Sequence, residues 1–279
     1  MRRVGSPAEV GALVEEARGA GKRIALVPTM GALHAGHVSL LEEGRRRGDV
    51  LVLSIFVNPA QFGRSEDLAR YPRDLEGDLA KARAAGVDVA FTPEGGAIYP
   101  PAFQTFVEVR DLSRPLCGAA RPGHFTGVAT VVLKLFHIVR PHVAIFGEKD
   151  WQQLQVVRRM VTDLALDVEI VGLPTVREAD GLAMSSRNAY LSAEQRRRAL
   201  AIPAGLAAAR ARFLAGERDA AQLVEAAATP VREQGLRIDY LELRDAETLE
   251  ERPLADRPTV LAVAAFVGNT RLIDNAVLR

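Results

Sequence analysis

The sequence predicts an α/β fold in which a doubly wound parallel sheet is followed by a smaller α+β domain. Through the first 175 residues, short β-branched runs alternate with helix-like stretches, and this alternation is typical of a parallel sheet. The runs are apolar almost throughout, as expected for strands that helices cover on both faces. The expected strands are residues 24–28, 50–57, 87–93, 142–147 and 166–172, and the expected helices are residues 8–20, 36–47, 74–86, 126–139 and 150–163.

The character of the sequence changes after about residue 176. Residues 192–234 are rich in Ala, Leu, Arg and Glu with a helical period, and three strand-like stretches follow, at residues 237–249, 258–268 and 270–278. Helices followed by a few strands indicate a second, smaller domain of α+β type. We place the boundary near Pro174, which predicts domains at residues 1–175 and 176–279.

The composition limits the classes of function. Net charge is +1, so no strong field attracts nucleic acid or a membrane surface. A single cysteine, Cys117, excludes an internal disulfide framework and a cysteine-based zinc site. No apolar segment follows the first residues, and no run of about 18 apolar residues occurs. We therefore expect a soluble, cytoplasmic protein.

The most informative stretch is "PTMGALHAGHVSL", residues 28–40, at the end of the first expected strand. Gly31 and Gly36 permit a tight connection. A helix that begins near Gly36 aims its free N–H groups out of the strand end, which makes an anion site. His34 and His37 then stand beside a bound phosphate and can donate to its oxygens. A two-histidine metal site and a pair of packed structural histidines are the alternatives.

A second polar stretch, "FGEKDWQQ", follows the expected strand at residues 142–147. Ligands of such sheets bind at the carboxyl ends of the strands, so Lys149, one of only four lysines, is placed to hold a polyphosphate. Gln152 and Gln153 can both donate and accept, which suits a substrate with hydroxyl and carboxylate groups. The alternative is an exposed helix start that Asp150 caps.

Two further stretches are weaker signals. "EADGLAMSSRN" is a polar loop whose serines, backbone N–H groups and Arg187 can wrap phosphates, although many serine-rich segments are only loops. "SIFVNPAQF" delivers Gln61 to the same sheet edge, where it is a candidate for binding the organic substrate. In the helix that follows, Asp78 either meets a magnesium ion or faces solvent.

Together these motifs resemble the pantoate–β-alanine ligase (pantothenate synthetase) family. The resemblance runs from about residue 25 to 276 through "PTMGALHAGH", "NPAQF", "YPRD", "RPGHFTGV", "FGEKDWQQ", "VREADGLAMSSRN", "DYLELRD" and "TRLIDNA". H-x-G-H alone also occurs in nucleotidylyltransferases and class I aminoacyl-tRNA synthetases, but its combination with G-E-K-D-x-Q-Q and M-S-S-R-N is specific. The resemblance implies a Rossmann-like N-terminal domain, a small C-terminal domain that acts as a lid, and a homodimer.

The resemblance also implies a reaction in two steps. ATP activates the carboxylate of (R)-pantoate as an enzyme-bound pantoyl adenylate, and pyrophosphate leaves. The amine of β-alanine then attacks the acyl carbon, which gives pantothenate and AMP. The implied partners are ATP with Mg²⁺, (R)-pantoate and β-alanine, with no nucleic acid and no membrane.

Roles follow for residues at matching positions. The implied ATP contacts are Met30, Gly31, Ala32, Leu33, His34, Ala35, Gly36, His37, Gly147, Glu148, Lys149, Asp150, Val176, Met184, Ser185, Ser186 and Arg187. The implied catalytic residues are His34, His37 and Lys149, and family descriptions name His37 as proton donor. Gln61 and Gln153 are implied to bind pantoate, with Gln61 also near β-alanine. Asp78 is the implied contact for Mg²⁺, and Gly77 stands where relatives have a second acidic residue, which weakens this assignment.

Two other functions share some of these motifs. A nucleotidyltransferase that leaves the nucleotide on its product would share the histidine motif, but would not need two glutamine clamps and a β-alanine site. A nucleotide-binding module without catalysis would need only the phosphate contacts. Pantoate-dependent formation of AMP and pantothenate separates these alternatives from the ligase.

Overall fold

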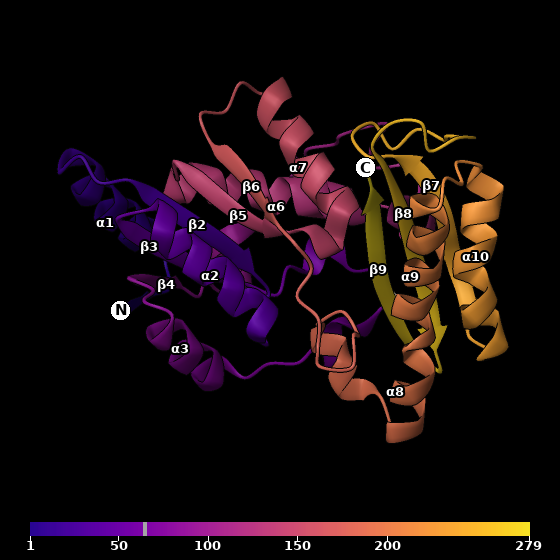
Figure 1. The fold of residues 1–279 in the computed structure, drawn as a ribbon. Coiled ribbons are helices and arrows are strands. Elements are labelled where there is room, and N and C mark those ends of the chain that lie inside the picture. The colour runs from indigo at the N-terminus through magenta and orange to yellow at the C-terminus, as the bar shows by residue number, and fades with distance from the viewer. Residues whose placement is uncertain (64–65) are drawn as a thin grey trace.

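The larger part of the molecule is built on a sheet of six parallel strands, in the order β1-β4-β3-β2-β5-β6 (Figure 1). The computed structural model describes residues 1–63 and 66–279. The strands of this sheet are β1 (Arg2–Val4), β2 (Ile24–Thr29), β3 (Val50–Ile55), β4 (Val89–Phe91), β5 (Val143–Gly147) and β6 (Glu169–Leu173).

Helices cover both faces of this sheet. Successive residues of a strand point to opposite sides, and because the central strands β2, β3 and β5 are apolar almost throughout, both faces are buried by helices. On one face, Ile24 and Leu26 of β2 belong to a core shared with α1, α6 and α7. On the other face, Ala25 and Val27 belong to a core shared with α2 and α3. The helices of this part are α1 (Pro7–Gly19), α2 (Ala35–Arg47), α3 (Leu75–Ala84), α4 (Gly95–Ile98), α5 (Cys117–Ala120), α6 (His124–Val139) and α7 (Trp151–Asp163).

The C-terminal part is a sheet of three antiparallel strands with helices packed on it (Figure 1). Its elements are α8 (Ala193–Ala199), α9 (Ala201–Leu214), α10 (Ala220–Glu233), β7 (Arg237–Asp245), β8 (Thr259–Val267) and β9 (Thr270–Leu278). The first core of the larger part also includes Ala246 and Val260. The two parts therefore pack against each other through a shared apolar contact.

The strand order reverses at β2. From β2 the chain continues to β3 on one side, and it later returns to place β5 on the other side. In open sheets of this kind, ligands bind in the crevice outside the carboxyl ends of the strands at such a switch point. Met30 directly follows β2, and Glu148 directly follows β5, so two of the motifs found in the sequence lie at this crevice.

The predicted fold class is confirmed, and each strand and helix expected in the first 175 residues is present close to its predicted range. Strand β1 was not predicted, because it has three residues and two of them, Arg2 and Arg3, are exposed and charged. The proposed boundary near residue 175 falls after β6, the last strand of the parallel sheet, and before α8. It remains a proposal.

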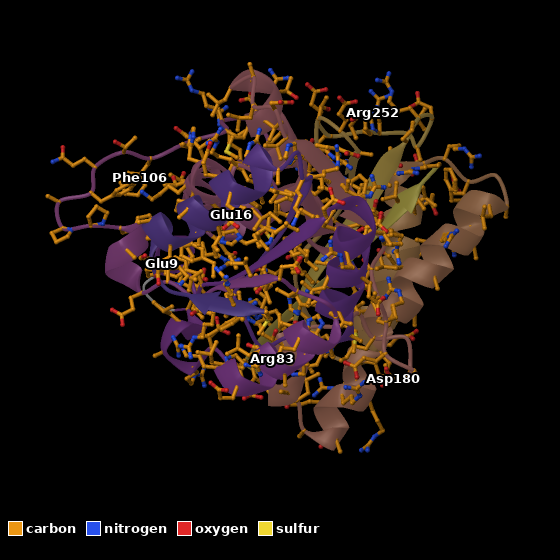
Figure 2. All side chains as sticks on the ribbon, turned by 90° about the vertical axis from the view of Figure 1, so that its left-hand side faces the viewer. Glu9, Glu16, Arg83, Phe106, Asp180 and Arg252 are labelled. Carbon is orange, nitrogen blue, oxygen red and sulfur yellow. The ribbon has the colours of Figure 1, made fainter. Side chains whose placement is uncertain are left out.

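Residues 104–110 lack helix and strand structure; Val107 and Val109 pack against the core, whereas Phe106 lies on the outside (Figure 2). Phe106 in this segment is 56% exposed. Within the described part of the chain, no main-chain hydrogen bond joins the segment to other backbone groups. The N–H of Val107 donates instead to the hydroxyl of Thr130, over 3.0 Å. The outer edge of the segment is therefore open to a partner.

Among residues 1–63 and 66–279, no helix combines the length and the apolar character that a membrane crossing requires.

Candidate active site

The chain turns sharply between β2 and α2. Gly31 (φ 81°) and Ala32 (φ 52°) both take the left-handed conformation, which costs a residue with a side chain roughly 1–2 kcal/mol. Asp78 of α3 offsets this cost. Its Oδ2 accepts from the N–H of Ala32 over 2.8 Å, and its Oδ1 accepts from the N–H of Leu33 over 2.6 Å.

His34 and His37 lie side by side where α2 begins, with ring centroids 4.1 Å apart. Gly36 makes room for this arrangement, because a Cβ at that position would lie 3.0 Å from the His34 ring. The N–H of His34 donates to Nδ1 of His37 over 3.3 Å. Since Nδ1 accepts, the hydrogen of a neutral His37 ring is on Nε2. Both rings line the smaller of two cavities at the sheet edge.

Both histidines are neutral in the free protein at pH 7. Removal from water, followed by the positive charge of Lys149, lowers the pKa of His34 to about 4. Removal from water, followed by His34 and Lys149, lowers the pKa of His37 to about 3. A neutral imidazole donates a hydrogen bond to a phosphate oxygen but carries no excess proton to transfer. The pair is therefore suited to stabilising charge.

Lys149 lies in the short 3-10 helix η3 (Glu148–Asp150), which joins β5 to α7. The C-terminal part holds this turn in place. Asn275 of β9 donates through Nδ2 to the carbonyl oxygens of Glu148 and Lys149, over 2.9 Å in each case. The ammonium group of Lys149 lies close enough to both histidines to lower their pKa values. A cation, two neutral donors and the start of α2 thus converge at the ends of β2 and β5.

Gln61 ends the 3-10 helix η1 (Pro59–Gln61), which follows β3. Its Oε1 accepts from Nδ2 of Asn58 over 3.0 Å, and Oδ1 of Asn58 accepts from the hydroxyl of Tyr99 over 2.9 Å. These contacts fix the orientation of the amide. Nε2 of Gln61 faces Met30, whose Sδ is 3.0 Å away, and the smaller cavity. Gln61 therefore presents a donor to a ligand.

The backbone of Gln61 is held by a second set of contacts. Arg121 is always protonated, so Nε2 of His124 accepts from its Nη1 over 3.1 Å. The hydrogen of His124 is then on Nδ1, which donates to the carbonyl of Gln61 over 2.9 Å. Burial, followed by the charge of Arg121, lowers the pKa of His124 to about 4. Glu66 completes the group by accepting from Nε of Arg121 over 2.9 Å.

The two adjacent glutamines of α7 have different environments. Gln152 is buried; its Oε1 accepts from the N–H of Cys117, and its Nε2 donates to the carbonyls of Leu112 and Pro115. The amide of Gln152 thus holds this loop, although the residue also lines the larger cavity, and its contact with a substrate stays a prediction. Gln153 lines both cavities at the sheet edge, as the sequence predicts for a ligand contact.

The segment that carries Met184 and Ser186 docks on the turn after β2. The N–H of Met184 donates to the carbonyl of Val176 over 3.0 Å, which places these two side by side. The hydroxyl of Ser186 donates to the carbonyl of Ala32 over 3.3 Å. The serine-rich loop is thus attached to the histidine motif.

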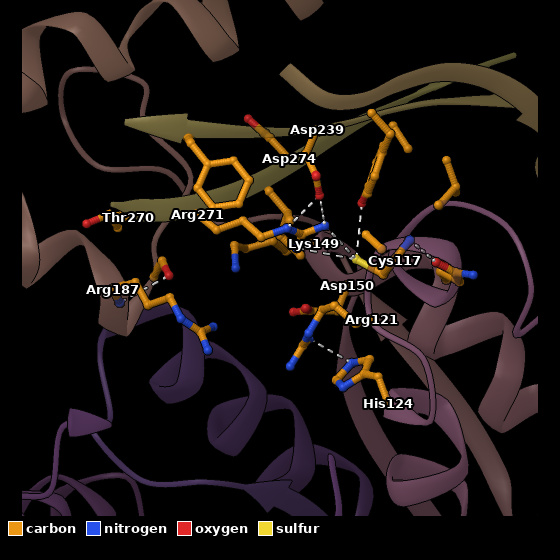
Figure 3. A pocket seen from close by; sticks show the side chains of 18 of the residues that line it. Cys117, Arg121, His124, Lys149, Asp150, Arg187, Asp239, Thr270, Arg271 and Asp274 are labelled. Carbon is orange, nitrogen blue, oxygen red and sulfur yellow. Dashed lines mark hydrogen bonds and ion pairs between the residues drawn. The ribbon is translucent and has the colours of Figure 1, made fainter. Parts of the chain in front are cut away.

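Arg187 belongs to the 3-10 helix η4 (Ser186–Tyr190) and points into the cavity region together with Lys149 (Figure 3). Its guanidinium forms a bidentate pair with Asp67, with Nε–Oδ2 at 2.9 Å and Nη2–Oδ1 at 2.8 Å. Asp67 thus orients the guanidinium at the cavity and leaves part of it able to donate to an anion.

The two cavities adjoin each other, with volumes of about 240 and 730 Å³. The larger one extends from the sheet edge to the strands of the C-terminal part. The predicted residues that line the smaller cavity are Met30, His34, Gly36, His37, Gln61, Gly147, Lys149, Asp150, Gln153, Val176, Met184, Ser185, Ser186 and Arg187. The other predicted residues, Gly31, Ala32, Leu33, Ala35, Glu148 and Asp78, do not line it. The structure therefore brings most of the predicted site together.

Asp78 does not have either environment that the sequence suggested. Its side chain is only 1% exposed, so it does not face solvent, and both carboxylate oxygens bond to the turn after β2. The residues present therefore do not fit a direct contact between Asp78 and Mg²⁺.

The sequence analysis missed the residues that hold the site residues in place. Asn58 and Asn275 both stand in quoted motifs, but their partners could not be read from the sequence. Asn275 bonds to a turn that is more than a hundred positions earlier in the chain. Asn58 stands only three positions before Gln61 in the sequence, so the contact between these two side chains could have been predicted.

Comparisons with known proteins agree with this geometry. A family model described as pantoate-beta-alanine ligase matches residues 2–277. The pantothenate synthetase of Geobacter sulfurreducens is 57% identical over 279 residues, covering 100% of this chain and 99% of the relative. That of Myxococcus xanthus is 60% identical over 263 residues, covering 92% of this chain and 89% of the relative.

Solved structures resemble the whole chain. The pantothenate synthetase of Thermus thermophilus superposes with a TM-score of 0.94 at 47% identity, with 99% of each chain covered. A pantoate-beta-alanine ligase of Francisella tularensis, complexed with beta-gamma ATP and beta-alanine, gives a TM-score of 0.83 at 32% identity, with 99% of this chain and 97% of that chain covered.

Proposed function

The chain belongs to the pantoate–β-alanine ligase family, and from this premise we propose that it condenses (R)-pantoate with β-alanine in a reaction that consumes ATP. Pantothenate, AMP and pyrophosphate are the products. The observation that carries the proposal is that phosphate donors and amide clamps share one cavity. His34, His37 and Lys149 line it beside Gln61 and Gln153.

In the first step, a carboxylate oxygen of pantoate attacks the α-phosphorus of ATP. A P–O bond forms to the carboxylate, and the bond to the pyrophosphate oxygen breaks. Negative charge grows on the leaving pyrophosphate, where Lys149 and Nε2–H of His37 are placed to stabilise it. Holding the two reactants in line supplies a further ~7–11 kcal/mol in well-oriented intramolecular reactions.

In the second step, the neutral amine of β-alanine attacks the acyl carbon of the adenylate. A C–N bond forms, the bond to the AMP oxygen breaks, and the amine proton leaves with solvent or phosphate. Gln61 is oriented to donate to the acyl substrate, because Asn58 occupies its Oε1. Arg187 and the docked serine loop support the phosphates during both steps.

Mg²⁺ enters this proposal as the companion of ATP. Magnesium in nucleotide sites is held largely by phosphate oxygens and water, with few protein ligands. It supplies charge neutralisation of the phosphates when bound. The predicted protein contact, Asp78, does not fit that role, and no step above depends on it.

We also propose that the chain works as a homodimer with the C-terminal part acting as a lid. The exposed Phe106 and the open backbone edge of residues 104–110 support a self-association surface. The larger cavity between the two parts supports movement of the C-terminal part over the substrates. The cytoplasmic location predicted from the sequence remains a prediction.

The reaction is tested by incubating the protein with ATP, pantoate and β-alanine. We expect AMP and pantothenate to form in equal amounts, and exchange of labelled pyrophosphate into ATP to require pantoate alone. A nucleotidyltransferase would leave the nucleotide on its product and release no AMP. A binding module would show no exchange. Either result would overturn the proposal.

A further inference from the structure

Asp78 is a buried carboxylate that no step of the proposed reaction uses. It lies on α3, behind the turn that carries the histidine motif, and its side chain is 1% exposed. Its two oxygens accept from two consecutive backbone N–H groups, those of Ala32 and Leu33, over 2.8 and 2.6 Å. A carboxylate in this environment is satisfied by backbone donors, which are strong partners for a charged acceptor.

The backbone of the turn is shaped around this carboxylate. The two donors, Ala32 and Leu33, come at the end of a turn in which Gly31 and Ala32 have positive φ, and successive N–H groups in such a turn form a concave anion site. The anion in this site is Asp78 itself. The approach is so close that a Cβ on Gly31 would lie 2.9 Å from Oδ2 of Asp78. The turn therefore covers the carboxylate and separates it from the cavity.

The surroundings also do not suit a divalent cation. Gly77 precedes Asp78 and offers no side chain, and Lys81 follows one helical turn later with a positive charge. The charge of Lys81 reaches as far as His34 and His37, where it lowers both pKa values. A second carboxylate ligand for a metal is missing at the positions next to Asp78.

We infer that Asp78 is a positioning residue, which holds the strand-to-helix turn in the shape that places His34 and His37 on the nucleotide, and that it does not bind metal. The same turn receives Ser186 through the carbonyl of Ala32, so Asp78 also fixes the docking point of the serine loop. This inference rests on the proposed ATP-binding role of the turn.

Hydrogen exchange in the protein without ATP and without metal tests the inference separately from catalysis. If Asp78 holds the turn, the amides of Ala32 and Leu33 are protected in the metal-free wild-type protein, and added MgCl₂ alone leaves their protection unchanged. Amides that exchange freely until metal is added would overturn the inference. This measurement does not depend on whether the protein makes pantothenate.

Substitution gives the second test. Asp78→Asn removes one acceptor and leaves a buried N–H unsatisfied, so we expect kcat/KM for ATP to fall about 10-fold, the change that corresponds to about 1.4 kcal/mol. Protection of the Ala32 and Leu33 amides falls as well. The Mg²⁺ concentration for half-maximal activity, at saturating ATP, stays that of the wild type.

Glu76→Gln is the matched control, because it removes an exposed carboxylate from the same helix. We expect it to leave both amide protection and activity unchanged. If excess Mg²⁺ restores Asp78→Asn to wild-type activity, Asp78 is a metal ligand and the inference is wrong. If Asp78→Asn does not fold, exchange in the wild-type protein still decides the question.

Discussion

At the scale of single residues, the protonation of the two histidines decides how the site works. The resemblance to the ligase family implies that His37 is a proton donor. In this chain, His37 is neutral in the free protein, and a backbone N–H occupies its Nδ1. Only Nε2–H is left to point at a substrate. We interpret His37 as a hydrogen-bond donor to the negative charge that grows on the pyrophosphate. Pyrophosphate is an acceptable leaving group without full protonation, so a hydrogen bond is sufficient.

This interpretation predicts a difference between two amide substitutions. His37→Gln places an N–H near the position of Nε2, whereas His37→Asn places one near Nδ1, where the N–H of His34 already donates. We expect His37→Gln to keep much of the rate of pantoyl-adenylate formation. His37→Asn and His37→Ala should lose about 10²–10³-fold, as is usual when one transition-state donor is removed.

Pyrophosphate release in the presence of pantoate measures this rate. Equal losses in all three variants would mean that the ring does more than donate from Nε2. Gly36→Ala is expected to crowd the His34 ring, which lies 3.0 Å from where the new Cβ would be. It is therefore not a suitable control.

At the scale of elements, the site depends on contacts between strands that are distant in sequence. Strand β9 reaches across to the η3 turn, where Asn275 holds two consecutive carbonyl groups. The neighbouring Asp274 is buried and pairs with Arg177, over 2.7 and 3.0 Å. One strand of the C-terminal part thus orients both the lysine turn and the start of the loop that lines the smaller cavity.

We expect Asn275→Ala to lower kcat about 30-fold, because the lysine turn loses two hydrogen bonds worth about 1 kcal/mol each, or about 2 kcal/mol together. KM for β-alanine should change little, since this residue acts on the phosphate side of the site. Steady-state kinetics with each substrate varied in turn measure this.

Gln222→Ala is the control. It removes an exposed amide side chain from α10, away from both cavities, and its kinetics should resemble those of the wild type. A kcat equal to that of the wild type in Asn275→Ala would contradict the prediction.

Much of this architecture could be predicted from the sequence, for a physical reason. Strands buried on both faces have to be apolar throughout, so the runs at β2, β3 and β5 were readable. The carboxyl ends of parallel strands meet at one edge, so the motifs after them had to converge. The role of Asp78 was not readable, because burial of a helix residue depends on which turn packs over it.

At the scale of the whole molecule, the chain consists of two packed parts and one surface segment, residues 104–110. Within the described residues, no main-chain hydrogen bond joins this segment to other backbone groups, and its Phe106 is exposed (Figure 2). Such an edge commonly pairs with another strand, and a two-fold axis lets identical edges pair antiparallel. A second copy of this chain is the partner that we propose.

Phe106→Asp should shift the protein from dimer to monomer, because it places a charge where the two copies would bury an aromatic ring. Sedimentation velocity over a range of concentrations measures the mass in solution. Leu214→Asp is the control, since Leu214 is 72% exposed and lies on α9. A Phe106→Asp protein that keeps the dimer mass would exclude this segment as the interface.

The bonds from Asn275 to the lysine turn also bear on how the protein is made. Ribosomes synthesise the chain from residue 1 onward, so the parallel sheet can form while strand β9 is still absent. The turn that carries Lys149 lacks the hydrogen bonds from Asn275 until β9 has been synthesised and has paired with β8. A nascent chain that ends before residue 274 would therefore contain the crevice of the parallel sheet without these two hydrogen bonds. A chain that lacks the final strand should therefore be less active than the full-length chain.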